Sequence, residues 1–297
     1  MDNKFPKITV VYIIVFMAIE WLLQLFTIFF TGDFFNSNGV NQLQSIFLTI
    51  CMFIPAVILI GFCLFRKIGF NELGLKPLKP QFWPFIFGIV VIIGAVLFLS
   101  ISWFSDFYNF SNINGEWKLE NVATIIAQPN KPIIFIINIL FSMALATIVT
   151  IPQAFGEELA WRGYLQNKFI KKFGVIKGIV FLGVIWGLFH LPINLAGYNY
   201  PETPVLGGFV YMVITCISLG AVFGWIRIKA NSVWPAAVAH AAYNVVVTVV
   251  AMNEPRINMH LFNVYKNGVE IIIGIIFIWL IIKEVKNIKI KSSQTST

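Results

Sequence analysis

Apolar runs of about twenty residues recur along the whole chain and leave little choice of fold. A run of this length, wound as an α-helix, crosses the hydrocarbon layer of a bilayer, where irregular backbone would lose its hydrogen bonds. We therefore predict an all-α, polytopic membrane protein with about eight transmembrane helices, arranged as a bundle. The expected spans are 8–30, 45–65, 82–103, 132–155, 176–197, 206–226, 232–251 and 269–282.

Composition supports a membrane protein and argues against nucleic-acid binding. Hydrophobic residues make up 58% of the chain and charged residues 11%, whereas a soluble domain carries about a quarter charged residues. The net charge of +8 is spread over short clusters between apolar runs, without a basic face or a nucleic-acid motif. Cys51, Cys63 and Cys216 fall inside apolar runs without paired spacing, which predicts small core residues and no disulfide or thiolate metal site.

The placement of the positive charges predicts the orientation in the membrane. With the N-terminus inside, seventeen of the 21 lysines and arginines lie in cytoplasmic segments, and only Lys118, Lys131, Arg256 and Lys266 lie outside. By the positive-inside rule, this bias predicts a multi-pass protein of the cytoplasmic membrane with both termini cytoplasmic. The polar tail 292–297 is expected to be disordered.

No repeat and no long linker divides the chain, so we expect one integral membrane domain. Within it, residues 1–131 hold the first three helices and their loops, residues 132–251 hold a core of four helices, and residues 252–297 hold the last helix and a cytoplasmic tail.

The segment from Gly156 to Arg162 places two carboxylates and a guanidinium between nearly uncharged runs. Ionisable side chains at membrane depth are costly and tend to mark function. On a helix, Glu158 and Arg162 are four residues apart and can form an ion pair. Glu157 points about 100° away from Glu158. We therefore expect Glu158 to be structural and Glu157 to be available for chemistry.

Two histidines fall inside apolar spans, and each is followed four residues later by an asparagine: His190 with Asn194, and His240 with Asn244. This spacing places both members of a pair on one helix face. Pro192 is expected to disturb the first helix. A single histidine could simply bond a neighbouring helix, but two such pairs beside the Glu-Glu-x-x-x-Arg segment favour a functional site.

These side chains suit hydrolysis of an amide bond without a serine or cysteine nucleophile. Glutamate and histidine together can deprotonate water and later protonate a leaving group, and a second histidine with an asparagine amide can stabilise an oxyanion. Glu157, His190 and His240 could instead be zinc ligands. Because no His-Glu-x-x-His segment is present, we favour a site without a cofactor, and zinc remains the alternative.

The same residues carry a resemblance to a known family. The chain resembles the CAAX protease and bacteriocin-processing (CPBP, or Abi) family of intramembrane proteases, related to CAAX prenyl endopeptidases and lysostaphin-resistance-like proteins. The first motif, Glu-Glu-x-x-x-Arg, matches Glu157 to Arg162, and the third, His-x-x-x-Asn, matches His240 and Asn244. The second, Phe-x-x-x-His, is met in part, since Trp186 stands in the phenylalanine position before His190.

The resemblance implies a function and a role for each matched residue. It implies an intramembrane endopeptidase, with its active site in a conical cavity of the helix bundle, that cleaves membrane-embedded or lipid-anchored peptide substrates. Glu157 and His190 would activate water, and His240 and Asn244 would form the oxyanion site. Glu158, Arg162 and Trp186 would support them. The family has been described both as glutamate-type and as metal-dependent.

Two functions of other classes use the same buried polar groups. A transporter or proton-coupled channel also needs intramembrane Glu, His and Arg, although no inverted repeat is evident. A catalytically silent membrane scaffold or immunity protein is the third alternative. Outside the three motifs, Glu20 with Gln24 is expected either to line a substrate path or to bond a neighbouring helix, and His260 is expected to be a solvated loop residue.

Overall fold

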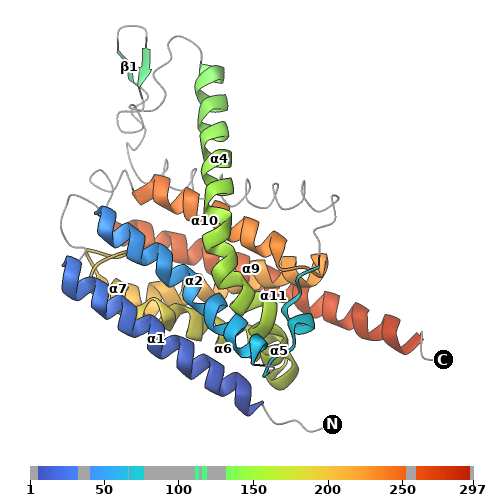
Figure 1. The fold of residues 1–297 in the computed structure, drawn as a ribbon. Helices are drawn as coiled ribbons and strands as arrows, with labels where there is room; N and C mark the ends of the chain where they lie inside the picture. The colour runs from blue at the N-terminus through green and yellow to red at the C-terminus, as the bar shows by residue number, and fades with distance from the viewer. Residues whose placement is uncertain are drawn as a thin grey trace.

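The computed structural model describes residues 6–32, 41–65, 67–76, 111–113, 116–118, 132–251 and 259–294. Helices dominate these residues and lie side by side over much of their length (Figure 1). Three of the described helices are long and apolar enough to cross a membrane: Lys7–Thr31, Gln42–Leu64 and Pro204–Ala230. The all-α membrane fold is therefore confirmed, while the expected span 82–103 and both expected boundaries, at 131 and 252, lie outside the described residues.

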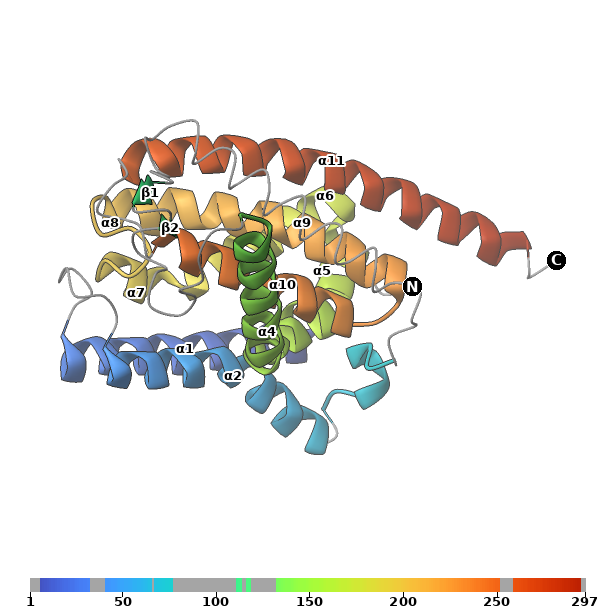
Figure 2. The same ribbon diagram turned by 90° about the horizontal axis from the view of Figure 1, so that it is seen from above.

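The first two helices form one side of the molecule. Helix α1 (Lys7–Thr31) packs along α2 (Gln42–Leu64), and Figure 2 shows the two running together. Asn41 caps α2 by accepting a hydrogen bond from the Gln44 backbone N–H, which satisfies a donor that the first helical turn would otherwise leave free. Apolar side chains such as Leu22 and Val57 remain exposed, as expected of a face that meets lipid.

Helix α4 (Pro132–Glu158) runs across the direction of these helices: it stands upright in Figure 1 and is seen end-on in Figure 2. It packs against α2 and α10. Gly156 allows the close approach to α2, since a Cβ atom there would lie 2.5 Å from the backbone oxygen of Met52. The chain continues as the π-helix η3 (Leu159–Leu165) and then α5 (Gln166–Phe173). The helix therefore runs through both glutamates toward Lys168, with a wider turn in the middle.

The expected span 176–197 is two helices. Helix α6 (Val175–Phe189) ends before His190, and α7 (Leu191–Leu195) follows with Pro192 in its first turn. Proline lacks an N–H group and its ring clashes with the preceding turn, so it suits a helix start and breaks a helix interior. The predicted disturbance at Pro192 is thus confirmed, and it leaves His190 at a break between helices.

The next segment contributes α9, a helix that is largely buried. Short α8 (Pro204–Leu206), the π-helix η4 (Gly207–Tyr211) and α9 (Met212–Ala230) follow one another, and α10 is Trp234–Ala251. Helix α9 packs against α6, α10 and α11. A Cβ atom on Gly183 would lie 2.5 Å from the Cα of Ile217. Small residues bring membrane helices into this kind of close contact.

The last helix differs most from expectation. Helix α11 is Met259–Gln294, far longer than the predicted span 269–282. His260 and Lys266, expected in an outer loop, are helical, and Lys266 is buried. His260 is exposed, as expected, and its ring nitrogen lies 3.3 Å from the Tyr211 hydroxyl. Residues 292–294, expected to be disordered, continue the helix, and 295–297 lie outside the described residues.

Two small elements complete the described chain. A 3-10 turn, η1 (Phe70–Leu73), packs against η3. Strands β1 (Ser111–Ile113) and β2 (Glu116–Lys118) pair antiparallel, with Asn112 opposite Trp117. This hairpin lies between the expected spans 82–103 and 132–155, and it is the only β-structure among the described residues. The three cysteines are free and buried, as predicted.

Candidate active site

The first motif forms the expected ion pair. Arg162 donates a 2.8 Å hydrogen bond from Nη1 to Oε1 of Glu158, and both side chains are almost fully buried. Glu158 directly precedes the π-helix η3 and Arg162 lies within it. Such π-helical turns often mark functional sites. Two bonds tie this stretch to α9: Arg227 Nε donates to the Arg162 carbonyl oxygen at 3.2 Å, and Gln166 Nε2 donates to the Gly224 carbonyl oxygen at 3.1 Å.

Glu158 has a second partner that the sequence did not reveal. Nδ1 of His240, on α10, lies 2.9 Å from the same Oε1 atom. A carboxylate oxygen accepts, so Nδ1 carries the hydrogen, and Nε2 is the nitrogen left for other partners. Glu158 therefore joins the first motif to the third.

Glu157 is held by two indole groups. Trp186 Nε1 donates to its Oε2 atom at 2.8 Å, and Trp161 Nε1 donates to the same atom at 3.3 Å. The side chain is 2% exposed. Its other oxygen, Oε1, accepts no hydrogen bond from any described residue. The expectation that Glu157 stays outside the Glu158–Arg162 pair is thus met, with both indoles as its partners.

His190 lies at the end of α6 and is half-buried. Its Nδ1 atom lies 3.0 Å from the backbone oxygen of Trp186. A carbonyl oxygen can only accept, so Nδ1 carries the hydrogen, and in the neutral ring Nε2 is the acceptor. No direct hydrogen bond joins His190 to Glu157 in the described part of the chain. The two groups meet through Trp186, which contacts one at its side chain and the other at its backbone.

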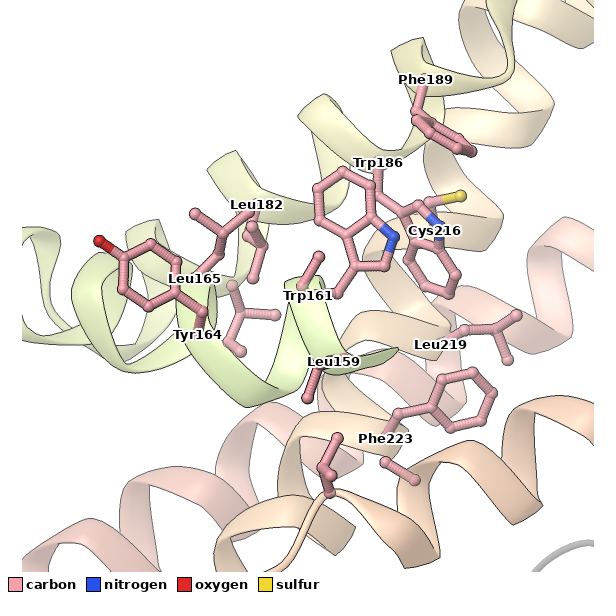
Figure 3. Close-up of a cluster of buried hydrophobic side chains, with 14 of the residues drawn as sticks. Leu159, Trp161, Tyr164, Leu165, Leu182, Trp186, Phe189, Cys216, Leu219 and Phe223 are labelled. Atoms are coloured by element: carbon pink, nitrogen blue, oxygen red, sulfur yellow. The ribbon is translucent and has the colours of Figure 1, made fainter. Parts of the chain in front are cut away.

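Aromatic rings and a cation enclose the centre of this site. The Arg162 guanidinium lies 4.1 Å from the centroid of the Trp186 ring system, a cation–π contact. The Trp186 and His240 rings meet edge to face at 5.5 Å, and Phe223 stacks on His240 at 5.5 Å. Figure 3 shows Trp161, Trp186 and Phe223 converging from η3, α6 and α9. A small cavity lies beside Arg162 and Trp186, and its other lining residues are Trp161, Ile179, Leu182, Gly183 and Gly220.

The two asparagines differ. Asn244 follows His240 by one turn of the continuous helix α10, as the spacing predicted, and is half-buried. Its side-chain amide makes no hydrogen bond to another described residue. Asn194 is fully buried, and its Oδ1 atom accepts a 2.8 Å hydrogen bond from Asn199. Asn194 lies in α7, where its backbone N–H donates to the His190 carbonyl oxygen at 3.1 Å, whereas Asn244 lies on the same helix as His240.

Helix α1 reaches the site from the side. Gln24 Nε2 donates to Glu20 at 2.7 Å and to the backbone oxygen of Phe189 at 2.9 Å. The bond to Phe189 links α1 to α6, which supports helix-to-helix bonding as the role of this pair. Oε2 of Glu20 is buried without a hydrogen-bond partner in the described residues.

The described side chains do not assemble a metal site. No three His, Cys, Asp or Glu residues among them are placed to hold one ion. In Glu157, His190 and His240, the alternative zinc ligands, one side-chain atom each is engaged by Trp186 or Glu158, which leaves Oε1 of Glu157 and Nε2 of each histidine.

A second buried polar cluster joins α11 to α9 and α10. The Lys266 ammonium lies 3.2 Å from Oε1 of Glu270. Three more side chains donate hydrogen bonds to the Glu270 carboxylate: Thr215 at 2.7 Å, Tyr243 at 2.7 Å and Asn267 at 2.9 Å. The sequence reading missed this cluster because it placed Lys266 in a loop. The sequence feature that could have revealed the cluster is the presence of Lys266, Asn267 and Glu270 within five positions, directly before an apolar run.

Comparison with known proteins shows what part of the chain is similar to. Residues 138–246 match the family model described as Type II CAAX prenyl endopeptidase Rce1-like. We call these residues the Rce1-like segment. The match confirms the resemblance drawn from the three motifs, and it contains all seven residues singled out from them. A search of curated proteins finds no match to the chain.

The Rce1-like segment runs from α4 to α10 and holds the whole polar centre described above. It supports an intramembrane protease of the CAAX type in general terms, and the apolar helices agree with a membrane protein. Helix α1 lies outside the matched residues, and so do Lys266, Asn267 and Glu270 of the second cluster, whereas their partners Thr215 and Tyr243 lie inside.

Proposed function

We propose that the chain is an intramembrane endopeptidase in which Glu157 and His190 activate water and His240 and Asn244 bind the oxyanion. The observation that carries this proposal is the convergence on Trp186. This one residue contacts Glu157, His190 and His240, which come from three different helical segments. Groups held together in this way can act on one bound peptide bond.

The water-activation step uses the side-chain atoms of Glu157 and His190 that do not bond to Trp186. Oε1 of Glu157 and Nε2 of His190 both have acceptor capacity, because Oε2 and Nδ1 are engaged. A water between them loses a proton to Glu157, and its oxygen attacks the peptide carbonyl carbon. The proton then passes to the amide nitrogen as the C–N bond breaks, giving a carboxylic acid and an amine.

Binding of the oxyanion is assigned to two side chains of α10, His240 and Asn244. His240 donates from Nε2 when its ring carries both hydrogens, while Nδ1–H keeps its hydrogen bond to Glu158. Asn244, on the same helix face, supplies an uncharged N–H donor. Donors fixed before the reaction stabilise the developing negative charge strongly in a low-dielectric site.

The substrate proposed is a membrane-embedded or lipid-anchored peptide, since the site lies among apolar helices. The proposed location is the cytoplasmic membrane with both termini in the cytoplasm. This orientation rests on the excess of lysine and arginine in the predicted inner segments. No cofactor is assigned.

Purified protein in liposomes with a library of quenched-fluorescence peptides tests this function. We expect cleavage of a subset of apolar peptides. Proton or solute flux without any cleavage would contradict the proposal and favour a transporter, whereas neither flux nor cleavage would favour a scaffold.

A further inference from the structure

Two indole N–H groups converge on one oxygen of Glu157, and no described residue donates to the other oxygen. Trp186 donates at 2.8 Å and Trp161 at 3.3 Å, both to Oε2. Hydrogen bonds to an ionised acceptor are roughly twice as strong as neutral ones. The bond from Trp186 is the shorter of the two, and both bonds engage Oε2.

The Trp186 indole is itself fixed on several sides. It is 3% exposed, the Arg162 guanidinium covers its face at 4.1 Å, and its ring meets His240 at 5.5 Å. The backbone of the same residue accepts the 3.0 Å hydrogen bond of His190. One residue therefore contacts both groups assigned to water activation, one through its side chain and the other through its main chain.

We propose that Trp186 is a positioning residue for this enzyme, whose indole N–H orients the Glu157 carboxylate for water activation. This inference rests on the proposed function. A phenylalanine, which the second motif carries at this position, has no donor and would leave the carboxylate with only the longer bond from Trp161. The chain thus uses tryptophan where the motif supplies only an aromatic wall.

Trp186→Phe tests the proposal, because it keeps the ring and removes the N–H. We expect kcat to fall about tenfold to a hundredfold, as loss of a hydrogen bond to a charged group implies, while KM stays within about twofold. Trp21→Phe is the matched control. It also removes a 2.9 Å indole bond, in this case to the Leu188 carbonyl oxygen, and it should leave kcat unchanged. A kcat of Trp186→Phe equal to that of the control would overturn the proposal.

A spectroscopic readout keeps the test independent of folding losses and of catalysis. Ultraviolet resonance Raman bands of tryptophan report hydrogen bonding at the indole N–H. In Glu157→Ala, with both tryptophans intact, these bands should shift toward a weaker hydrogen bond, and an unchanged spectrum would overturn the proposal. This shift is expected even if the protein cleaves no peptide, so failure of the proposed function and failure of the positioning role give different results.

Discussion

Glu158 accepts a 2.9 Å hydrogen bond from Nδ1 of His240, although the two residues are 82 positions apart. The same carboxylate oxygen accepts the 2.8 Å bond from Arg162. One buried carboxylate thus holds together the π-helix after α4 and the helix that carries the proposed oxyanion site.

Arg162→Ala should destabilise the protein strongly. Without the guanidinium, Glu158 keeps only His240, and breaking a buried pair costs about 3–5 kcal/mol. We expect a clearly lower Tm and low yield, with loss of activity. Lys229→Ala is the control, because Lys229 pairs with Glu284 on a largely exposed surface, where such pairs contribute about 0–1 kcal/mol. Equal melting temperatures for the two variants would show that the Glu158–Arg162 pair is not structural.

Gly156→Ala should disturb both packing and chemistry. The added Cβ would meet the Met52 backbone oxygen at 2.5 Å, and overpacking of this kind costs about 1–3 kcal/mol. Because Glu157 is the next residue, activity should fall as well. Gly61→Ala, in α2, has open space around its added Cβ, so its Tm and turnover should match the parent protein. Thermal melts and peptidase assays on both variants check this prediction, and identical behaviour would contradict it.

Asn244→Ala should separate catalysis from stability. Its side-chain amide bonds no other described residue, so we expect an unchanged Tm. Removing one oxyanion donor lowers kcat by about 100- to 1,000-fold in comparable sites. Steady-state kinetics with a cleaved peptide would measure the loss. An unchanged kcat would remove Asn244 from the oxyanion role and leave His240 as the remaining candidate.

Lys266→Met should lower stability and leave catalysis intact, the reverse of Asn244→Ala. The variant removes the cation next to Glu270, whose side chain is 5% exposed, and we expect a loss of about 3 kcal/mol. The cluster fastens α11, which lies outside the Rce1-like segment. The kcat measured at temperatures well below Tm should therefore remain near the parent value. A large fall in kcat with an unchanged Tm would connect this cluster to the chemistry.

The sequence predicted the parts of this molecule that depend on local spacing. The spans at α1 and α2, the Glu158–Arg162 pair and the break at Pro192 follow from apolar length, the helical repeat and the missing proline N–H. Long-range contacts do not follow from spacing. The His240–Glu158 bond and the indole donors to Glu157 arise from close packing of helices far apart in the chain.

The extent of α11 was the main error at the C-terminal end. Hydropathy placed the span at 269–282 because Lys266 and Asn267 lower the average before it. The helix begins at Met259. Hydrogen bonds among Lys266, Glu270, Thr215 and Tyr243 offset the cost of burying these polar groups. The polar tail likewise stays helical to Gln294.

The turnover number of Glu157→Gln tests the central claim most directly. Glutamine keeps an oxygen that accepts from Trp186 and Trp161, so the fold and Tm should be retained, but it cannot take a proton from water. We predict that kcat falls about 100- to 10,000-fold relative to the parent protein. Near-parental turnover by a folded Glu157→Gln variant would contradict the account, because Glu157 would then have no part in activating water.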